Sequence, residues 1–533
     1  MKGKQTQSKR KQNTKGRQRM NNGSGRRDYQ NTSREAYRKE ALAAEATEHK
    51  YNDVSWYAKN QQMLSDAASF SYNSPLGNRI PWERVAALPQ DATGIANWIK
   101  APEVPGLMLF KFEPGIGISK NSSSPANLAA QNIYTYVRYM NSGSKNYDQA
   151  DLMLYLLAMD SIYMVWNWMK RVYGYASLYS QYNKYLPRVF AQADNVDLDD
   201  VIANMADFRY HINSLAAQIS SFCVPAVMPL FVRHSWMVSN LYKDSNLLKS
   251  QMYMMSPNTY YVYSETGSPY GGYLQAKGFP NPTSGMKITD MVAVMKDMLN
   301  KVAYSEDIGV MSGDILKAYG QERLFKISPV EENYTVEPVY NEEVLNQLHN
   351  SRMVSMSRTN ITQDPDTGFL IYDPVTTEKA VAVTDATFVN MPWDSVTPAN
   401  TMVGTRLTPV LSRVDANTVK VQAAGSEIIS RRSILYYDFD QSSAGVIQKR
   451  ELPSALYMLQ DVTSEMVSMI SNFDWHPLFP MWWKTGSGDT TTYVFKGMLG
   501  DISNYTIIDN YSMEQMHTTA ILSEFNVPQL GSF

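Results

Sequence analysis

The chain has 533 residues, 44% of them hydrophobic, which is enough to bury a substantial core in one large unit or several domains. The single cysteine, Cys223, excludes an intramolecular disulfide, and the absence of an N-terminal apolar run argues against a secretory signal. The formal net charge of −2 hides an asymmetry, because residues 1–27 contain ten Lys and Arg and no acid, and the remainder therefore carries −12.

The first element in chain order is a basic N-terminal arm, residues 1–50, which we expect to be disordered because so few of its early residues are apolar. Residues 34–50 are mostly good helix formers, so a short helix fits there. The ten cationic residues are the candidate RNA-binding residues: Lys2, Lys4, Lys9, Arg10, Lys11, Lys15, Arg17, Arg19, Arg26 and Arg27.

Lys and Arg spaced by small polar residues favour contact with a phosphate backbone, with strongly salt-dependent affinity. No aromatic residue precedes Tyr29, so double-stranded nucleic acid fits the arm as well as a single strand does. A solvated tail or a nuclear-import signal around residues 9–11 is the open alternative.

Residues 51–120 are rich in turn-forming residues and predict irregular, extended chain. From about 124 to 325 the helical pattern dominates. We expect helices over residues 125–141, 151–170, 198–222 and 291–302. The second is apolar nearly all round, and Asp160 and Asn167 interrupt it, which indicates a buried core helix rather than a membrane span.

Short strand-like runs follow beyond residue 330, and a helix is expected again over residues 453–470. The expected strands are residues 336–340, 369–372, 380–383, 418–422, 434–439, 490–495 and 505–508. We therefore predict a mainly α fold with a smaller β-rich part. The strands are too scattered for a jelly roll.

The sequence offers no catalytic site, cofactor site or metal site. It has no phosphate-binding loop, no cysteine pair for zinc, and six histidines without metal-ligand spacing. His211 and Cys223 lie too far apart on one helix to meet as base and nucleophile, so we interpret both as structural. The acidic run Asp194, Asp197, Asp199 and Asp200 is interpreted as helix N-terminal charge rather than as a metal site. We expect no enzymatic activity.

Several blocks, in order and spacing, carry a family resemblance. They are residues 52–60, 74–77, 141–143, 151–163, 231–237 (FVRHSWM) and 305–320. Together they resemble the capsid proteins of picobirnaviruses over about residues 50–330, and more loosely beyond.

The resemblance implies a mainly helical shell domain over residues 51–330, a strand-rich projecting region over 331–450 and a mixed C-terminal region over 451–533. It implies homodimers that close an icosahedral shell around a segmented dsRNA genome, with the arm inside the virion and assembly in the host cytoplasm. The viral polymerase as a packaged partner and transient membrane contact on entry are further implications. A nucleoprotein that coats nucleic acid without enclosing it is the alternative.

Overall fold

The computed structural model describes residues 59–70, 104–143, 147–179, 185–247, 250–265, 271–378, 383–415, 418–438, 446–458 and 464–526. The chain divides into two compact units, Met1–Ser74 and Pro75–Phe533. In the first unit, helix α2 (Gln61–Ala68) begins after Asn60, whose side-chain oxygen accepts a hydrogen bond from the backbone N–H of Met63 at 3.1 Å. The basic arm and the helix expected over residues 34–50 lie outside the described residues.

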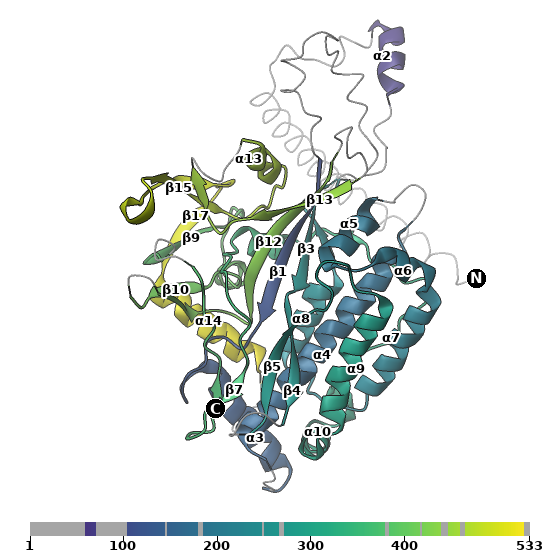
Figure 1. The fold of residues 1–533 in the computed structure, drawn as a ribbon, viewed down its shortest axis with the longest axis vertical. Helices are drawn as coiled ribbons and strands as arrows, with labels where there is room; N and C mark the ends of the chain where they lie inside the picture. The colour runs from purple at the N-terminus through teal and green to yellow at the C-terminus, as the bar shows by residue number, and fades with distance from the viewer. Residues whose placement is uncertain are drawn as a thin grey trace, which may run out of the picture. The chain divides into compact units, whose positions relative to one another are not determined.

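The second unit is built on a six-stranded mixed sheet with β1 (Val104–Pro114) inside it (Figure 1). The strand order is β13-β12-β1-β3-β2-β6. The partners of β1 are β12 (Glu427–Asp438), antiparallel, and β3 (Met252–Pro257), parallel. The outer strands are β13 (Val446–Leu452), β2 (Leu241–Lys243) and β6 (Pro338–Val339). The sheet thus joins chain segments that are more than 300 residues apart.

Helices cover one side of this sheet in successive layers. Helix α8 (Pro229–Ser239) packs on β3, α4 (Gln149–Ala176) packs on α8, and α7 (Met205–Ile219) and α9 (Ile288–Ala303) lie beyond α4 (Figure 1). Helix α4 is buried on nearly all its faces, as an all-round apolar sequence requires. The remaining helices of this part are α3 (Pro125–Met140), α5 (Tyr185–Asp194), α6 (Leu198–Ala203) and α10 (Glu306–Tyr319), followed by the 3-10 turn η3 (Gln321–Arg323).

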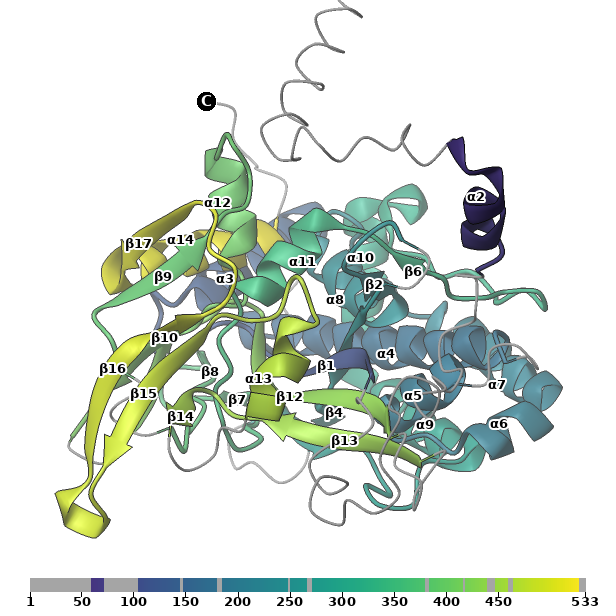
Figure 2. The ribbon, with the colours of Figure 1, turned by 90° about the horizontal axis from the view of Figure 1, so that it is seen from above.

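Smaller sheets and short helices fill the other side, where β9, β10 and β14–β17 gather away from α7 (Figure 2). The sheet of β4 (Thr259–Ser264) and β5 (Tyr273–Gly278) is an exception, because β4 packs against α4 and α9 on the helical side. The other small sheets are β7 (Thr362–Gln363) with β8 (Leu370–Ile371), β9 (Ala386–Asn390) with β17 (Tyr505–Asp509), β10 (Val410–Arg413) with β11 (Val419–Ala423), and β14 (Leu456–Met458) with β15 (Phe479–Thr485) and β16 (Thr492–Leu499). The helices there are α11 (Glu342–His349), α12 (Pro398–Gly404), α13 (Ser464–Ser471) and α14 (Asn510–Glu524), with the 3-10 turn η5 (Gly488–Thr490).

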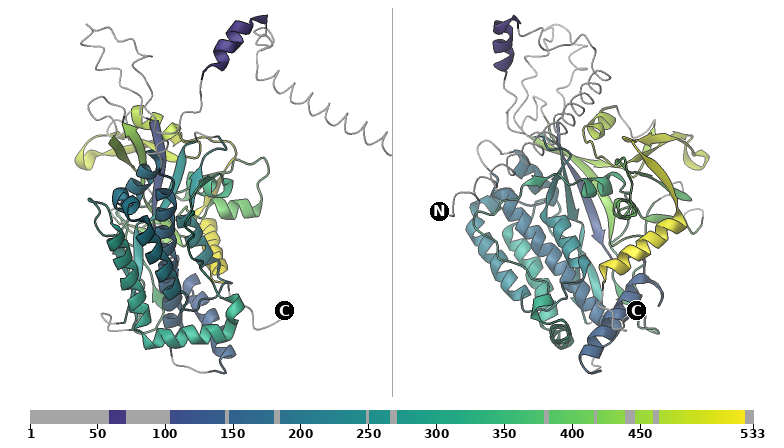
Figure 3. Two further views of the ribbon diagram at one scale, coloured as in Figure 1. Left: turned by 90° about the vertical axis from the view of Figure 1, so that its right-hand side faces the viewer. Right: turned by 180° about the vertical axis from the view of Figure 1, so that it is seen from behind.

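The largest hydrophobic core extends from the helices into part of the strand-rich side. Helix α14 returns to pack against α3 and α8 (Figure 3). Ile521 on α14 and Phe479 on β15 belong to the same buried cluster as the residues of α4. This core joins β15 and α14 to the helices, whereas β9, β10 and β11 pack around two smaller apolar clusters.

The predicted class, mainly α with a smaller β-rich part, is confirmed, and no jelly roll occurs among the described strands. Helix α3 begins at Pro125 after Ser124, as expected, and α9 lies over the predicted 291–302. Of the predicted strands, residues 380–383 fall almost entirely outside the described ranges, and each of the others overlaps an observed strand. The boundaries near residues 50, 330 and 450 stay predictions.

Four local predictions were wrong. Residues 51–120 contain β1, a strand hidden by the apparent breakers Pro105, Gly106 and Pro114. The helix expected over residues 198–222 breaks at Asn204, whose side chain donates to the carbonyl oxygen of Asp200 at 2.9 Å, and α7 ends at Ile219.

Over residues 453–470, residues 456–458 form β14, because their pairing with β15 overrides helix propensity, and helix α13 begins at Ser464. Helix α4 continues through Gly174 to Ala176, although this glycine was expected to lie beyond the helix end. A Cβ atom at Gly174 would lie 2.7 Å from a ring carbon of Tyr334 and 3.0 Å from the backbone nitrogen of Val336. The glycine is therefore required for close packing, not for helix termination.

Candidate functional site

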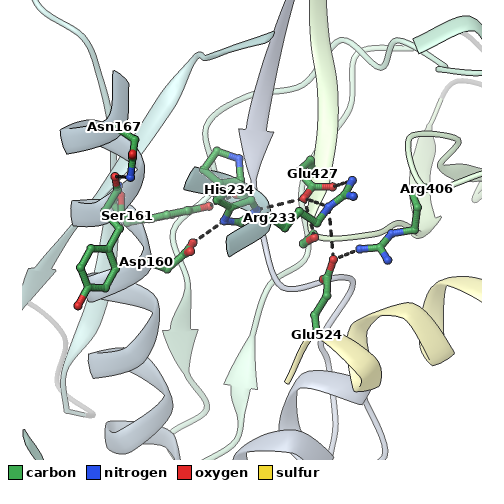
Figure 4. Close-up of polar contacts among 12 residues, drawn as sticks. Asp160, Ser161, Asn167, Arg233, His234, Arg406, Glu427 and Glu524 are labelled. Atoms are coloured by element: carbon green, nitrogen blue, oxygen red, sulfur yellow. Dashed lines mark hydrogen bonds and ion pairs between the residues drawn. The ribbon is translucent and has the colours of Figure 1, made fainter. Parts of the chain in front are cut away.

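A group of buried and half-buried charged side chains joins the helices to the strand-rich elements, and we call it the junction cluster (Figure 4). Its members are Asp160 on α4, Arg233 and His234 on α8, Arg406 just after α12, Glu427 at the start of β12 and Glu524 at the end of α14. Three carboxylates thus face three cations, so the formal charges balance. Charges removed from water need such pairing.

His234 lies at one end of the junction cluster, between two carboxylates. Its Nδ1 is 2.5 Å from Asp160 Oδ2, and its Nε2 is 3.3 Å from Glu427 Oε1. Burial alone would lower the pKa of His234, but the two carboxylates outweigh it and raise that pKa to about 10. His234 is therefore an imidazolium at neutral pH, with both ring nitrogens protonated.

Glu427 is the centre of the cluster. Arg233 donates to both of its carboxylate oxygens, through Nε at 2.5 Å and Nη2 at 2.7 Å, and Ser426 Oγ donates at 2.8 Å. Burial would raise the pKa of Glu427, but Arg233 and His234 hold it well below its usual range.

Glu524 extends the network to α14. Its Oε1 lies 3.4 Å from Arg233 Nε and forms an ion pair with Arg406. Burial, together with repulsion from Arg233, lowers the pKa of Arg406 to about 10. Through these contacts, side chains from α8, β12, α14 and the turn after α12 hold one another in a single geometry.

The arrangement suits structural clamping rather than catalysis. In a Ser–His–acid triad the outer imidazole nitrogen faces a nucleophilic hydroxyl, whereas Nε2 of His234 faces the carboxylate of Glu427. Asp160, His234, Glu427 and Glu524 are each at most 4% exposed, so a substrate in solvent has no access to them.

A second buried ion pair anchors the other end of α4. Arg171 Nη2 donates to both carboxylate oxygens of Asp194, at 2.9 and 3.1 Å, and both side chains are fully buried. Arg171 Nη1 donates to the carbonyl oxygen of Met255 at 2.7 Å. Ser256 Oγ donates to Asp194 Oδ1 at 2.8 Å. This pair fixes α4 and α5 to β3.

The acidic run of the sequence therefore has two separate roles. Asp197 caps α6 by accepting the N–H of Asp200 at 3.2 Å, and Asp199 and Asp200 lie in the first turn, as predicted. The interpretation of Asp194 as helix N-terminal charge was wrong, because this residue ends α5 and binds Arg171.

The ten predicted RNA-binding residues, Lys2 to Arg27, all lie outside the described residues, so their role stays a prediction. His211 contacts Asp207 at 3.5 Å, and the N–H of Cys223 donates to Ser312 Oγ at 2.9 Å. Both residues take part in local structural contacts.

Sequence reasoning did not identify the junction cluster, although it contained two signals. Asp160 interrupts an otherwise apolar helix, and Arg233-His234 lies between the large apolar residues Phe231 and Trp236. A charged residue at a core position predicts a buried partner, but not which one.

Within the described ranges, no cluster of three or more His, Cys, Asp or Glu has an arrangement that could hold a metal ion. Of the helices in those ranges, none is both long and apolar enough to cross a bilayer.

Comparison with known proteins gives a consistent result. A model of the picobirnavirus capsid protein family matches residues 56–439. The capsid protein precursor of Human picobirnavirus (strain Human/Thailand/Hy005102/-) is 29% identical over 535 residues, which cover 94% of this chain and 95% of that relative. The X-ray structure of the picobirnavirus capsid matches with a TM-score of 0.75 at 22% identity, over 89% of this chain and 98% of the other, and thus shares the fold. Since the family model spans well over half of the sequence, the chain belongs to the picobirnavirus capsid protein family.

Proposed function

We propose that this capsid protein forms symmetric dimers that close into an icosahedral shell around a segmented dsRNA genome, with residues 1–27 contacting the RNA inside. Membership in the capsid protein family carries the proposal, because a capsid protein associates with itself and is part of the virion. In this scheme residues 51–330 form the shell and residues 331–450 the projection. Assembly takes place in the host cytoplasm, and the viral polymerase is packaged inside the shell. The capsid contacts a membrane transiently during entry.

The distribution of charge supports an interior, RNA-binding arm. Ten cations in residues 1–27 precede a body with a net charge of −12. An anionic body repels phosphate while the arm attracts it, so RNA is drawn to the arm and does not spread over the body.

Exposed apolar side chains support self-association. On β17, Tyr505 is 60% exposed and Ile507 is 65% exposed, and the two lie on one face of the strand because side chains alternate. Tyr511, at the start of α14, is 71% exposed. Large apolar residues gathered at a surface are typical of protein contacts.

Electron microscopy of the expressed full-length protein tests the assembly. We expect closed, hollow particles, whereas filaments whose length follows the nucleic acid would favour the nucleoprotein alternative. Monomers or small oligomers under every salt and pH condition would contradict the proposal.

The role of the arm is tested by replacing its ten Lys and Arg with glutamine, which keeps the length of the arm. Co-purifying RNA, read as the ratio of absorbance at the nucleic-acid and protein maxima, should fall strongly while particles still form. A chain deleted for residues 1–27 should behave in the same way. Undiminished RNA in both variants would show that the arm is not the RNA contact.

A further inference from the structure

A mostly apolar cavity of about 310 Å³ lies among the strand-rich elements, between β9 and the β14–β16 sheet. Its large apolar lining residues are Phe388, Tyr457, Trp482, Phe495 and Met498. The volume is at the lower end of the range typical of small-molecule sites. The cavity lies apart from the junction cluster, none of whose members lines it.

A buried arginine lines this cavity. Arg432 on β12 is 1% exposed, and its Nη2 donates to the carbonyl oxygens of Pro453 at 3.2 Å and Ser454 at 3.5 Å. Its guanidinium carbon lies 4.5 Å from the centre of the Phe479 ring. Its Nε and Nη1 are buried and have no hydrogen-bond partner among the described residues. Two donors of a buried cation are thus left without an acceptor, which is costly unless an anion supplies one.

One carboxylate, Glu378, also lines the cavity. It accepts the N–H of Ser355 at 2.8 Å and the hydroxyl of Ser454 at 3.2 Å. Neither Nε nor Nη1 of Arg432 donates to it among the described residues. An anion next to Arg432 would supply the acceptors that these two donors lack.

We propose that this cavity binds a single-chain fatty acid, with the carboxylate accepting hydrogen bonds from Nε and Nη1 of Arg432 and the aliphatic tail lying against Trp482 and Phe495. The Nε and Nη1 donors of a guanidinium form a fork that matches the two oxygens of a carboxylate. A neutral apolar ligand would leave this fork unsatisfied. A nucleotide would place polar groups against the aromatic lining, and a two-chain lipid would exceed the volume.

Calorimetric titration of the full-length protein with decanoate, and with decanol as the neutral match, tests the head-group contact. Decanoate should bind at least tenfold more tightly than decanol. Arg432→Met should remove this preference and weaken decanoate binding at least tenfold. Arg431→Met is the matched control, because the neighbouring side chain points to the opposite face of β12, is exposed and does not line the cavity. Equal affinity for the acid and the alcohol, or an equal loss in both variants, would overturn the proposal.

A second measurement holds even if the Arg432 variant does not fold. Brominated decanoate should quench tryptophan fluorescence in the unmodified protein, and the quenching should fall clearly in Trp482→Phe. Ala386→Phe, which places a ring in the cavity and leaves Arg432 in place, should abolish decanoate binding. Quenching that is unchanged in Trp482→Phe, or full binding by Ala386→Phe, would place the ligand elsewhere and refute the assignment.

Discussion

Replacing Glu427 with glutamine removes one charge from the centre of the junction cluster while keeping the shape of the side chain. Glu427 is 1% exposed and binds Arg233 through two hydrogen bonds. The substitution leaves three cations, one buried and two half-buried, facing two carboxylates. Breaking a buried ion pair by removing one partner costs about 3–5 kcal/mol, because the remaining charge has lost its compensation.

The size of the unit sets the expected change in melting temperature. Pro75–Phe533 is one compact unit of roughly 460 residues. At about 2 cal/mol/K per residue, its unfolding entropy is about 1 kcal/mol/K. A loss of about 3–5 kcal/mol of stability therefore lowers the melting temperature by about 3–5 °C. Scanning calorimetry of the full-length protein, at fixed concentration and scan rate, measures it.

Glu332→Gln is the matched control, since Glu332 is 86% exposed and lies 3.8 Å from Arg209. An exposed pair contributes about 0–1 kcal/mol, so this variant should melt within about 1 °C of the unmodified protein. The double variant Glu427→Gln/Arg233→Met restores the balance of charge and should recover part of the loss. A Glu427→Gln protein that melts like the control would refute the reasoning.

Three further predictions concern packing and pH. Leu156→Asp places a charge on α4 at a position that is only 1% exposed, so it should abolish the yield of soluble protein. Leu156→Met should keep that yield. A normal yield of the Leu156→Asp variant would show that the helix is not in the core. Gly174→Ala should destabilise the protein by about 1–3 kcal/mol, because the added Cβ would lie 2.7 Å from the Tyr334 ring. Gly309→Ala, which has open space on α10, should stabilise the protein by up to about 1 kcal/mol. Thermal melting measures both changes, and a change of the same sign in both variants would contradict the prediction. Burial lowers the pKa of His349 and of His517 to about 4 each. The neutral form of each histidine therefore stabilises the folded state fully above about pH 6.5. This stabilisation, on the order of 3 kcal/mol per residue, is lost as the pH falls toward 4. The melting temperature should fall over this interval, and less steeply in His517→Gln; parallel pH profiles would exclude this histidine as a cause.

Local patterns predicted α3, α4 and α9. Helices α5, α8, α10, α11, α12 and α14 were not predicted. The 3.6-residue periodicity of α3 and α9, and the all-round apolar character of α4, are properties of consecutive residues and are visible in the sequence. The central strand β1 was missed for the opposite reason. Its partner strands begin at residues 252 and 427, and the residues near 104 contain no pattern that predicts pairing over such a distance in the sequence.

The junction cluster shows the same limit at a functional level. Asp160 and Glu524 are more than 360 residues apart in sequence, and they are linked only through Arg233 and His234 on α8. The sequence could indicate that Asp160 needed a partner but not that His234 supplies it. The arm, in contrast, was predicted from charge alone, because its chemistry requires no fold, and its role stays a prediction.

A charged cluster is a poor means of adding stability, since apolar residues of similar volume often do as well. It is better suited to fixing geometry. The core shared by the helices and the strand-rich elements is apolar, and apolar contacts are non-directional. The forked contact between Arg233 and Glu427 accepts only one orientation of α8 relative to β12, and Glu524 extends that constraint to α14. In the proposed assembly, many identical copies must meet at the same angles to close a shell. A subunit in which side chains from α4, α8, β12 and α14 are held in one register meets that requirement better than an apolar core alone would.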